Sequence, residues 1–317
     1  MKHEFVPYLI QCITNMHVGS GDANYGVVDK LVQRDPVTDY PTIHPSSLKG
    51  ALREHFEQQW IHPHFDFSKF SKTLNEILKD IASEFKKKKE ERSFDFLKAC
   101  LISSSTVEKA LKSIKDVEDI FGKEAIGGSD SETGEYKFLG ADLVSLPVRC
   151  NFKQYVMALN IDQLKTLNNK AELLTKNKIF NGMDAATKLF YKPNEPNYDV
   201  YAEDIRITSK AAIQKVTTAN SGLKSFDEKY ASFTNEDFKT ITKNLPVIAR
   251  NYIEDGTSEN LWYEEVVPHQ SVFLTFIAET DNLKTEFEII LNNTIIQIGG
   301  NATIGYGLCK FYKVTFN

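Results

Sequence analysis

The sequence carries a short apolar segment beside a glycine-rich one near each of its ends. Near the start, FVPYLIQCIT (residues 5–14) precedes HVGSGDANYG (17–26), and near the end GGNATIGYG (299–307) precedes LCKFYKVTF (308–316). Short apolar runs that are partly β-branched are typical of buried strands. If these two strands pair with each other, the two glycine-rich segments lie together and can line one groove.

Neither glycine-rich segment matches a nucleotide-binding motif. Gly19, Gly21 and Gly26 have the spacing GxGxxxxG instead of GxGxxG, and the residues after them look extended. In the second segment, Tyr306 stands where a P-loop requires lysine. Glycine still lets a backbone approach a phosphate and present bare N–H groups to it. Phosphate binding and two tight turns without a ligand are therefore both open interpretations.

A helix is predicted over about residues 47–60. Proline and serine at 45–47 offer an N-terminal cap, and the apolar residues that follow have helical spacing. Lys49 and Arg53 stand four residues apart and so share one face. Gly50 between them costs roughly 1 kcal/mol of helix stability relative to alanine, which suggests that something large packs against that side. A phosphate backbone and a neighbouring helix are both candidates.

The remaining segments indicate a mixed α and β chain. Residues 62–120 have a highly charged helical pattern, in which the four lysines at 86–89 are followed at once by two glutamates, as on a solvated helix face. Strands are predicted within 136–150 and 271–280, the second with alternating apolar residues. Residues 160–250 mix short helical fragments with turn-rich sequence, and we interpret them as an insertion that projects from the core.

Composition limits what the chain does. Of its 317 residues, 41% are hydrophobic and 26% are charged, as in ordinary globular proteins. The net charge of −5 excludes a polycation, so any nucleic-acid surface must be a local basic patch. The four cysteines lack CxxC spacing and are expected to be reduced thiols in a cytoplasmic protein. No run of about 18 apolar residues is present, so no membrane span is predicted.

Acidic residues gather at the first glycine-rich segment. Asp22, Asp29 and Asp35 lie on it or shortly after it, together with His17. A carboxylate that faces a phosphodiester can hold a divalent cation, and a histidine can transfer a proton. A lone aspartate in a loop is usually a turn or capping residue, and His17 is equally well explained as structural. The glutamates at 264–265 are further potential metal ligands, or an exposed pair at a strand entrance.

Five motifs, taken in order, resemble the RAMP superfamily. They are HVGSG…GVVDKLVQRD…YPTIHPSSLKGALRE near the start, FG at 121–122, GADLVSLPVR from residue 140, LWYEE from residue 261 and IGGNATIGYG near the end. Within the superfamily, the pattern is most similar to the repeated backbone subunit of the Cmr complex, the type III-B CRISPR effector. The resemblance covers about residues 5–60, 120–150 and 250–314 and is weak elsewhere.

The resemblance implies an α+β fold with a ferredoxin-like (RRM-type) palm, a helical insertion and a protruding thumb hairpin. The single RAMP domain would divide into a palm of about 1–60, 120–160 and 250–317, a helical insertion of about 61–119 and a thumb or lid insertion of about 161–249. It also implies that copies of the chain stack into a helical filament along a guide (CRISPR) RNA, together with other Cmr subunits. Bound single-stranded target RNA would be cleaved at regular intervals.

The resemblance further implies roles for individual residues. Asp29, in the GVVD motif, would be the catalytic residue and the ligand of a divalent metal ion, Mg²⁺ or Mn²⁺, while His17 and Glu264 would be further catalytic residues. Which of the two glutamates at 264–265 points inward is left open. Asp22 is an additional carboxylate that complicates the choice of Asp29. The RNA-binding residues would be Ser47, Lys49, Arg53, Gly299, Gly300, Gly305 and Gly307.

Three alternative functions fit part of the same pattern. A structural RNA-binding backbone subunit would keep Lys49 and the glycine loops but would not need Asp29. A guide-processing endoribonuclease of the same superfamily would rely on histidine and need no metal. A small-molecule phosphate-binding enzyme is disfavoured because both nucleotide motifs fail. The carboxylate at position 29 favours the nuclease that cleaves target RNA.

Overall fold

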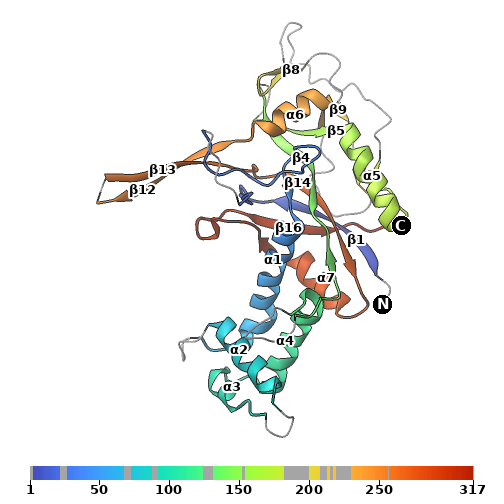
Figure 1. Cartoon of the computed structure of the whole chain (residues 1–317). Coiled ribbons are helices and arrows are strands. Elements are labelled where there is room, and N and C mark those ends of the chain that lie inside the picture. Colours follow the sequence, from blue (N-terminus) through green and yellow to red (C-terminus); the bar gives the residue numbers. More distant parts are fainter. Residues whose placement is uncertain are drawn as a thin grey trace. The chain divides into compact units, whose positions relative to one another are not determined.

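The computed structural model folds into two compact units (Figure 1). The sheet unit comprises residues 4–48, 138–278 and 285–317, and the helical unit comprises 1–3, 49–137 and 279–284. The residues that the structure describes are 3–21, 27–67, 73–87, 92–123, 131–151, 154–181, 200–207, 213–214, 217–218, 230–255 and 257–316. Asp22, Gly26 and much of the expected thumb or lid insertion therefore lie outside the described residues.

The two terminal strands pair with each other in the sheet unit. Strand β1 (Glu4–Cys12) runs antiparallel to β16 (Leu308–Lys313), with Tyr8 opposite Lys313 and Cys12 opposite Cys309. The pairing of these two strands, on which the proximity of the two glycine-rich segments depends, is therefore observed. Strand β1 is buried along most of its length, and buried residues alternate along the first half of β16. Side chains of a strand in a covered sheet are removed from water in this way.

The main sheet has the strand order β15-β16-β1-β14-β4-β5-β11-β9. Strand β14 (Val272–Glu279) is buried along its whole length and pairs antiparallel with β4, while β11 runs parallel to β5. The other strands of this sheet are β2 (Thr42–Ile43), β3 (Lys137–Phe138), β4 (Ala141–Arg149), β5 (Tyr155–Asn160), β9 (Ile213–Gln214), β11 (Tyr230–Phe233) and β15 (Ile295–Gln297). The helices that accompany it are α5 (Ile161–Thr175), α6 (Asn235–Lys243) and α7 (Lys284–Asn293), and short strands lie apart from it at β6 (Phe180–Asn181), β7 (Val200–Ala202), β8 (Ile205–Ile207) and β10 (Thr217–Thr218).

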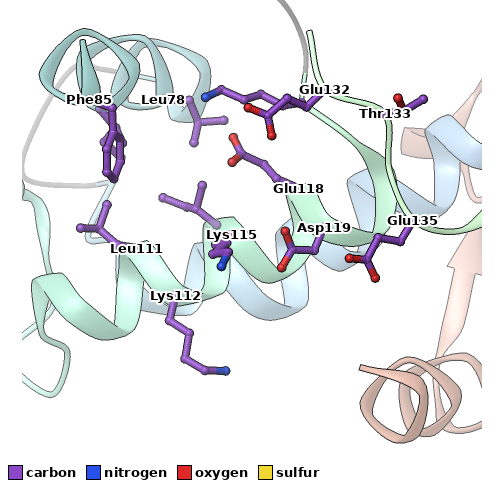
Figure 2. Close-up of a pocket in the computed structure, with 13 residues that line it drawn as sticks. Leu78, Phe85, Leu111, Lys112, Lys115, Glu118, Asp119, Glu132, Thr133 and Glu135 are labelled. Atoms are coloured by element: carbon purple, nitrogen blue, oxygen red, sulfur yellow. The ribbon is translucent and has the colours of Figure 1, made fainter. Parts of the chain in front are cut away.

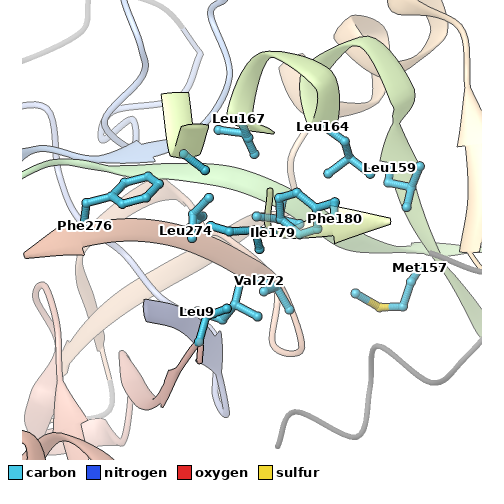
Figure 3. Close-up of a cluster of buried hydrophobic side chains, with 13 residues drawn as sticks. Leu9, Met157, Leu159, Leu164, Leu167, Ile179, Phe180, Val272, Leu274 and Phe276 are labelled. Carbon is cyan, nitrogen blue, oxygen red and sulfur yellow. The ribbon is translucent and has the colours of Figure 1, made fainter. Parts of the chain in front are cut away.

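Helix α5 belongs to the core of the sheet unit. Its side chains Leu164 and Leu167 pack with Leu9, Leu274 and other buried residues of the sheet (Figure 3). This differs from the expectation that residues 160–250 project from the core as a whole. The physical reason is that one face of α5 is apolar and removes a continuous hydrophobic surface from water when it covers the sheet.

The helical unit is built mainly from α1, α2 and α4. Helix α1 (Pro45–Phe56) starts in the sheet unit and continues into a π-helical turn at Glu57–Ile61, close to the predicted span. A short 3₁₀ turn (His62–His64) follows, then α2 (Leu74–Phe85), α3 (Asp95–Cys100) and α4 (Val107–Phe121). Thr73 and Glu76 form a capping box that begins α2. No helix among the described residues is long and apolar enough to cross a membrane.

A cavity of about 680 Å³ opens between α2, α4 and the segment at 132–135 of the helical unit (Figure 2). Leu78, Phe85 and Leu111 give it an apolar side, and Glu118 and Asp119 give it an acidic one. Burial raises the pKa of both of these carboxyl groups above their ordinary values.

The helical insertion expected at 61–119 is part of a somewhat larger unit, since most of α1 and residues 120–137 belong to the same compact unit.

A two-stranded hairpin extends from the sheet unit (Figure 1). Its strands are β12 (Val247–Glu254) and β13 (Thr257–Glu265), which pair antiparallel with each other and with no other named strand among the described residues. The described residues from 251 to 261 are all exposed, whereas Glu264 and Glu265 at the base are buried. The thumb was expected within 161–249, and this hairpin lies almost wholly after that range.

We predict that Asn168→Ala strongly destabilises the sheet unit. The Asn168 side chain is buried, accepts hydrogen bonds from the backbone N–H groups of Ile179 and Phe180 and donates one to the Phe180 carbonyl. Each buried group left unpaired costs about 1–3 kcal/mol. Urea unfolding should therefore show a clear loss of stability, whereas the matched control Asn169→Ala, at an exposed position of the same helix, should stay within about 0.5 kcal/mol of the wild type. Equal stability of the two variants would contradict this account.

Candidate functional site

The two glycine-rich segments contact each other through their backbones. The N–H of Gly300 donates to the carbonyl of His17 (2.8 Å), and the N–H of Gly307 donates to the carbonyl of Asn15 (2.8 Å). Gly299 has a positive φ of 89°, and a β-carbon there would collide with the His17 carbonyl. Glycine at 299 is therefore required by the packing of one loop on the other. Gly305, by contrast, has open space around it.

His17 is a buried residue with a defined tautomer. Its side chain lies among loops and is only 6% exposed, and its Nδ1 is 2.7 Å from the backbone carbonyl of Glu265. A carbonyl oxygen only accepts hydrogen bonds, so Nδ1 carries the proton. In the neutral ring Nε2 is then an acceptor, and it lies 3.8 Å from Oε1 of Glu264.

Asp29 is held by β13 but keeps one oxygen free. Its N–H donates to the carbonyl of Tyr263 (3.0 Å), and its Oδ2 accepts from the N–H of Tyr263 (2.7 Å). The residue itself is exposed. Within the described part of the chain, its Oδ1 makes no hydrogen bond. Asp29 is thus a carboxylate fixed by Tyr263, whose second oxygen has no hydrogen-bond partner among the described residues.

Glu264 is a buried carboxylate that joins four segments. It is 1% exposed, and its Oε2 accepts from Nε of Arg250 (2.5 Å) and from Nδ2 of Asn301 (2.8 Å). Its Oε1 lies 3.9 Å from Nζ of Lys30 and also faces His17. A buried charge is stable only when it is paired and hydrogen-bonded, and these contacts supply both conditions.

Glu265 serves the opposite face of the same strand, because successive strand residues alternate. Its Oε1 pairs with Nη2 of Arg34 (2.5 Å), and its Oε2 accepts from the N–H of Val32 (3.0 Å). Arg34 also donates to the backbone carbonyls of Asp39 and Thr242. Both glutamates are therefore buried, and the interpretation of an exposed pair at a strand entrance is wrong.

The expected RNA-binding residues of α1 differ in their availability. Arg53 is paired with Glu57 (2.9 Å) and donates to the carbonyl of Gly122. Lys49 forms no ion pair or hydrogen bond with the residues that the structure describes. The Ser47 hydroxyl accepts from Nε2 of Gln33 (2.8 Å). Of these two cations of α1, Arg53 is paired and Lys49 has no partner among the described residues.

Gly50 does not face a neighbouring helix in the described structure. No described heavy atom lies within 4 Å of the position that a β-carbon would take there. The expectation that a neighbouring helix packs against this glycine is therefore not met among the described residues, and the space remains open to an external partner.

Asp35 has a structural role in a turn. Burial acts to raise the pKa of its carboxyl group, but hydrogen bonds from the N–H groups of Thr38 and Val37 and from the Thr38 hydroxyl outweigh it and lower the pKa. The carboxylate thus stabilises the turn at 35–38, and the hydrogen bonds that it accepts from described residues all lie within that turn.

Three residues of the site escaped the sequence analysis, namely Lys30, Arg250 and Asn301. Each contacts Glu264, but they lie far apart in the sequence and belong to no common motif. Lys30 and Asn301 carried local signals, since Lys30 follows Asp29 directly and Asn301 lies in the GGNATIGYG segment, whereas Arg250 carried none. Among the residues described, no three His, Cys, Asp or Glu side chains gather closely enough to hold a metal ion by themselves.

The chain is similar in sequence to known proteins. A relative from Pyrococcus furiosus, described as the CRISPR system Cmr endoribonuclease Cmr4, is 25% identical over 96% of this chain and 92% of its own length. A second relative, the CRISPR system CMR subunit Cmr4 of Saccharolobus solfataricus, is 47% identical over a stretch that covers 15% of each chain.

Solved structures share the fold. A chain in a cryo-EM structure of a type III-B Cmr-beta complex bound to cognate target RNA superposes with a TM-score of 0.60 at 18% identity, covering 98% of this chain and 97% of that one. A crystal structure of oligomeric Cmr4 from Pyrococcus furiosus superposes with a TM-score of 0.53 at 17% identity, covering 99% and 100%. The mixed α and β fold is therefore that of these subunits.

The family model described as the RAMP superfamily matches residues 9–310. That span includes both glycine-rich loops, Asp29, helix α1 and the hairpin. The chain belongs to the RAMP superfamily.

Proposed function

We propose that this chain is a backbone subunit of a type III-B CRISPR complex that binds guide RNA and cleaves single-stranded target RNA. The single observation that carries the cleavage proposal is Asp29, an exposed carboxylate hydrogen-bonded to Tyr263 whose second oxygen has no partner in the described part of the chain. The named relatives support membership of such a complex, since one is called a Cmr endoribonuclease and a chain of similar fold occurs in a type III-B Cmr-beta complex with target RNA. Other Cmr subunits and further copies of this chain in a helical filament are the proposed protein partners.

A divalent metal ion fits the free oxygen of Asp29. Mg²⁺ and Mn²⁺ prefer oxygen ligands, and Mg²⁺ is commonly held by one or two carboxylates together with phosphate oxygens and water. The absence of a three-residue ligand cluster among the described side chains means that Asp29 would share the ion with the RNA. Such an ion, when bound, stabilises negative charge on the phosphodiester.

The neighbouring residues would orient the RNA and move a proton. The His17 ring is fixed through Nδ1–H, so its Nε2 is the nitrogen able to accept or return a proton. We assign Glu264 an indirect role, because both of its oxygens already face Arg250, Asn301, Lys30 or His17. It would set the position of the His17 ring and of strand β13, to which Asp29 is hydrogen-bonded through Tyr263.

The guide RNA would be held through its backbone. Lys49 can contribute a phosphate contact, and Ser47 and the loop at 299–307 can offer hydroxyl and N–H donors. Such contacts do not read bases, so the choice of target would come from pairing between guide and target. Arg53 would contribute less than Lys49, since Glu57 already neutralises it.

A non-catalytic RNA-binding backbone subunit is the second candidate. It is favoured by one observation, namely that His17 and both buried glutamates are engaged in contacts that stabilise the fold. Variants of Asp29 separate the two candidates.

Asp29→Asn should abolish target cleavage while leaving guide binding intact. Asparagine can still accept from the Tyr263 N–H, so the loop keeps its shape, but the negative charge is lost. A thousandfold loss of rate corresponds to about 4 kcal/mol of transition-state stabilisation. Single-turnover cleavage by the assembled complex measures this, with Asp204→Asn at an exposed turn as the control. Cleavage at the wild-type rate would assign the chain to the non-catalytic candidate.

Lys49→Ala should weaken RNA binding similarly for all sequences and lower its salt dependence. Each lost phosphate contact reduces the slope of log affinity against log salt by about 0.7 for single strands. Arg53→Ala should change the slope less, since its guanidinium is paired with Glu57. Filter binding at several salt concentrations gives both slopes. If Lys49→Ala has the wild-type slope, the lysine does not contact a phosphate.

Target RNA should be cut at evenly spaced positions, and a chelator should suppress all cuts together. Stacked copies would repeat the Asp29 loop at a fixed rise, and every loop would depend on the same metal chemistry. Guides of two lengths with end-labelled target on a denaturing gel test this, and the longer guide should add cuts at the same interval. Cuts whose positions follow base identity would contradict the proposal. So would cleavage in EDTA at the same rate as in Mg²⁺.

A further inference from the structure

Arg250 lies at the base of the hairpin, where it makes two different contacts. On β12 it stands opposite Trp262 of β13, and its Nε pairs with Oε2 of Glu264. Its guanidinium also stacks over the Tyr306 ring of the C-terminal glycine loop, 4.6 Å from the centroid. The side chain is 16% exposed. Arg250 therefore joins the hairpin to the glycine loop through an ion pair and a cation–π contact.

A second link reinforces this junction. Asn301, on the same glycine loop as Tyr306, donates to the Glu264 oxygen that Arg250 also contacts. The hairpin is otherwise a two-stranded element whose outer half is exposed, and such a ribbon is poorly fixed by itself. Its direction thus depends on contacts at its base.

The position of Asp29 depends on the same base. Both the N–H and the Oδ2 of Asp29 are bonded to Tyr263, the residue between Trp262 and Glu264 on β13. Lys30 likewise contacts Glu264 and the Trp262 ring. A shift of β13 relative to the glycine loop would therefore carry Asp29 with it.

We propose that Arg250 is a positioning residue that fixes the hairpin base against the glycine loop and so sets where bound RNA lies relative to Asp29. This inference rests on the proposed RNA-cleaving function. Arg250 touches no reacting atom in this scheme and acts through Glu264, Tyr306 and β13. Its Nη2 has no hydrogen-bond partner among the described residues, so the ion pair with Glu264 and the contact with Tyr306 are the side-chain contacts that anchor it.

The test compares Arg250→Lys, Arg250→Met and Tyr306→Leu in the assembled complex. Lysine keeps a charge for Glu264 but cannot form a planar stack on Tyr306, while Tyr306→Leu removes the stack and leaves the ion pair. Arg149→Met is the matched control, because that arginine forms an exposed ion pair with Glu203 and its side chain is 88% exposed. The measurements are guide affinity, single-turnover cleavage rate and the exact phosphate cut on end-labelled target.

The two Arg250 variants should bind guide RNA as the wild type does, and Tyr306→Leu is compared at saturating guide RNA because Tyr306 lies on the loop proposed to hold the guide. All three variants should cut more slowly than the wild type, by up to about a hundredfold for Arg250→Met, because a misplacement of about 1 Å costs that much. Cuts should also spread to neighbouring phosphates, which a loss of stability alone would not cause. Wild-type rate and cut position in Arg250→Lys and Tyr306→Leu would overturn the inference, even if Arg250→Met fails to assemble.

The outcomes also separate this inference from the function on which it rests. If the wild-type complex cuts in an Asp29-dependent way and the junction variants match it, only the role of Arg250 is wrong. If the wild-type complex does not cut, or if the Asp29→Asn complex cuts at the wild-type rate, the proposed function and the inference both fail.

Discussion

The antiparallel pairing of β1 with β16 is the contact on which the site depends. It places the two terminal strands side by side, as the second and third strands from one edge of the main sheet, and the loops that leave these strands then bond to each other through His17, Gly300 and Gly307. Glycine is needed at both places, since a β-carbon at 299 would collide with the His17 carbonyl of the facing segment and one at 307 would collide with the Ile298 carbonyl of its own segment. The glycines at 299 and 307 are thus explained by packing, and RNA binding by this loop is part of the proposed function.

Burial of the Glu264 charge organises the second part of the site. A carboxylate that is removed from water needs cations and donors around it, and here these come from the hairpin, the glycine loop and the segment at residue 30. Glu265 does the same on the opposite face with Arg34. Asp29 differs from both because it is exposed and keeps one oxygen free, and this contrast is why we assign the chemistry to Asp29 and positioning to Glu264.

Lys49 and Arg53 of helix α1 differ in whether another residue already pairs with their charge. Lys49 and Arg53 have the spacing of one helix face, yet Arg53 is paired with Glu57 and the Gly122 carbonyl, whereas Lys49 has no such partner among the described residues. Spacing therefore indicates which residues share a face, while the partners decide which of them can meet an RNA phosphate.

The sequence by itself determined the terminal strands, helix α1 and the helical character of residues 62–120, because periodicity and caps are local signals. It also singled out Asp29, His17 and Lys49 as candidates through an ordered set of motifs, and their roles remain proposals. It did not reveal that α5 covers the sheet, since a helix of modest amphipathicity can be solvated or buried depending on what faces it. It also could not show that Glu264 meets Arg250, Asn301, Lys30 and His17. These residues come from separate segments, and only the tertiary structure brings them within reach of one buried charge.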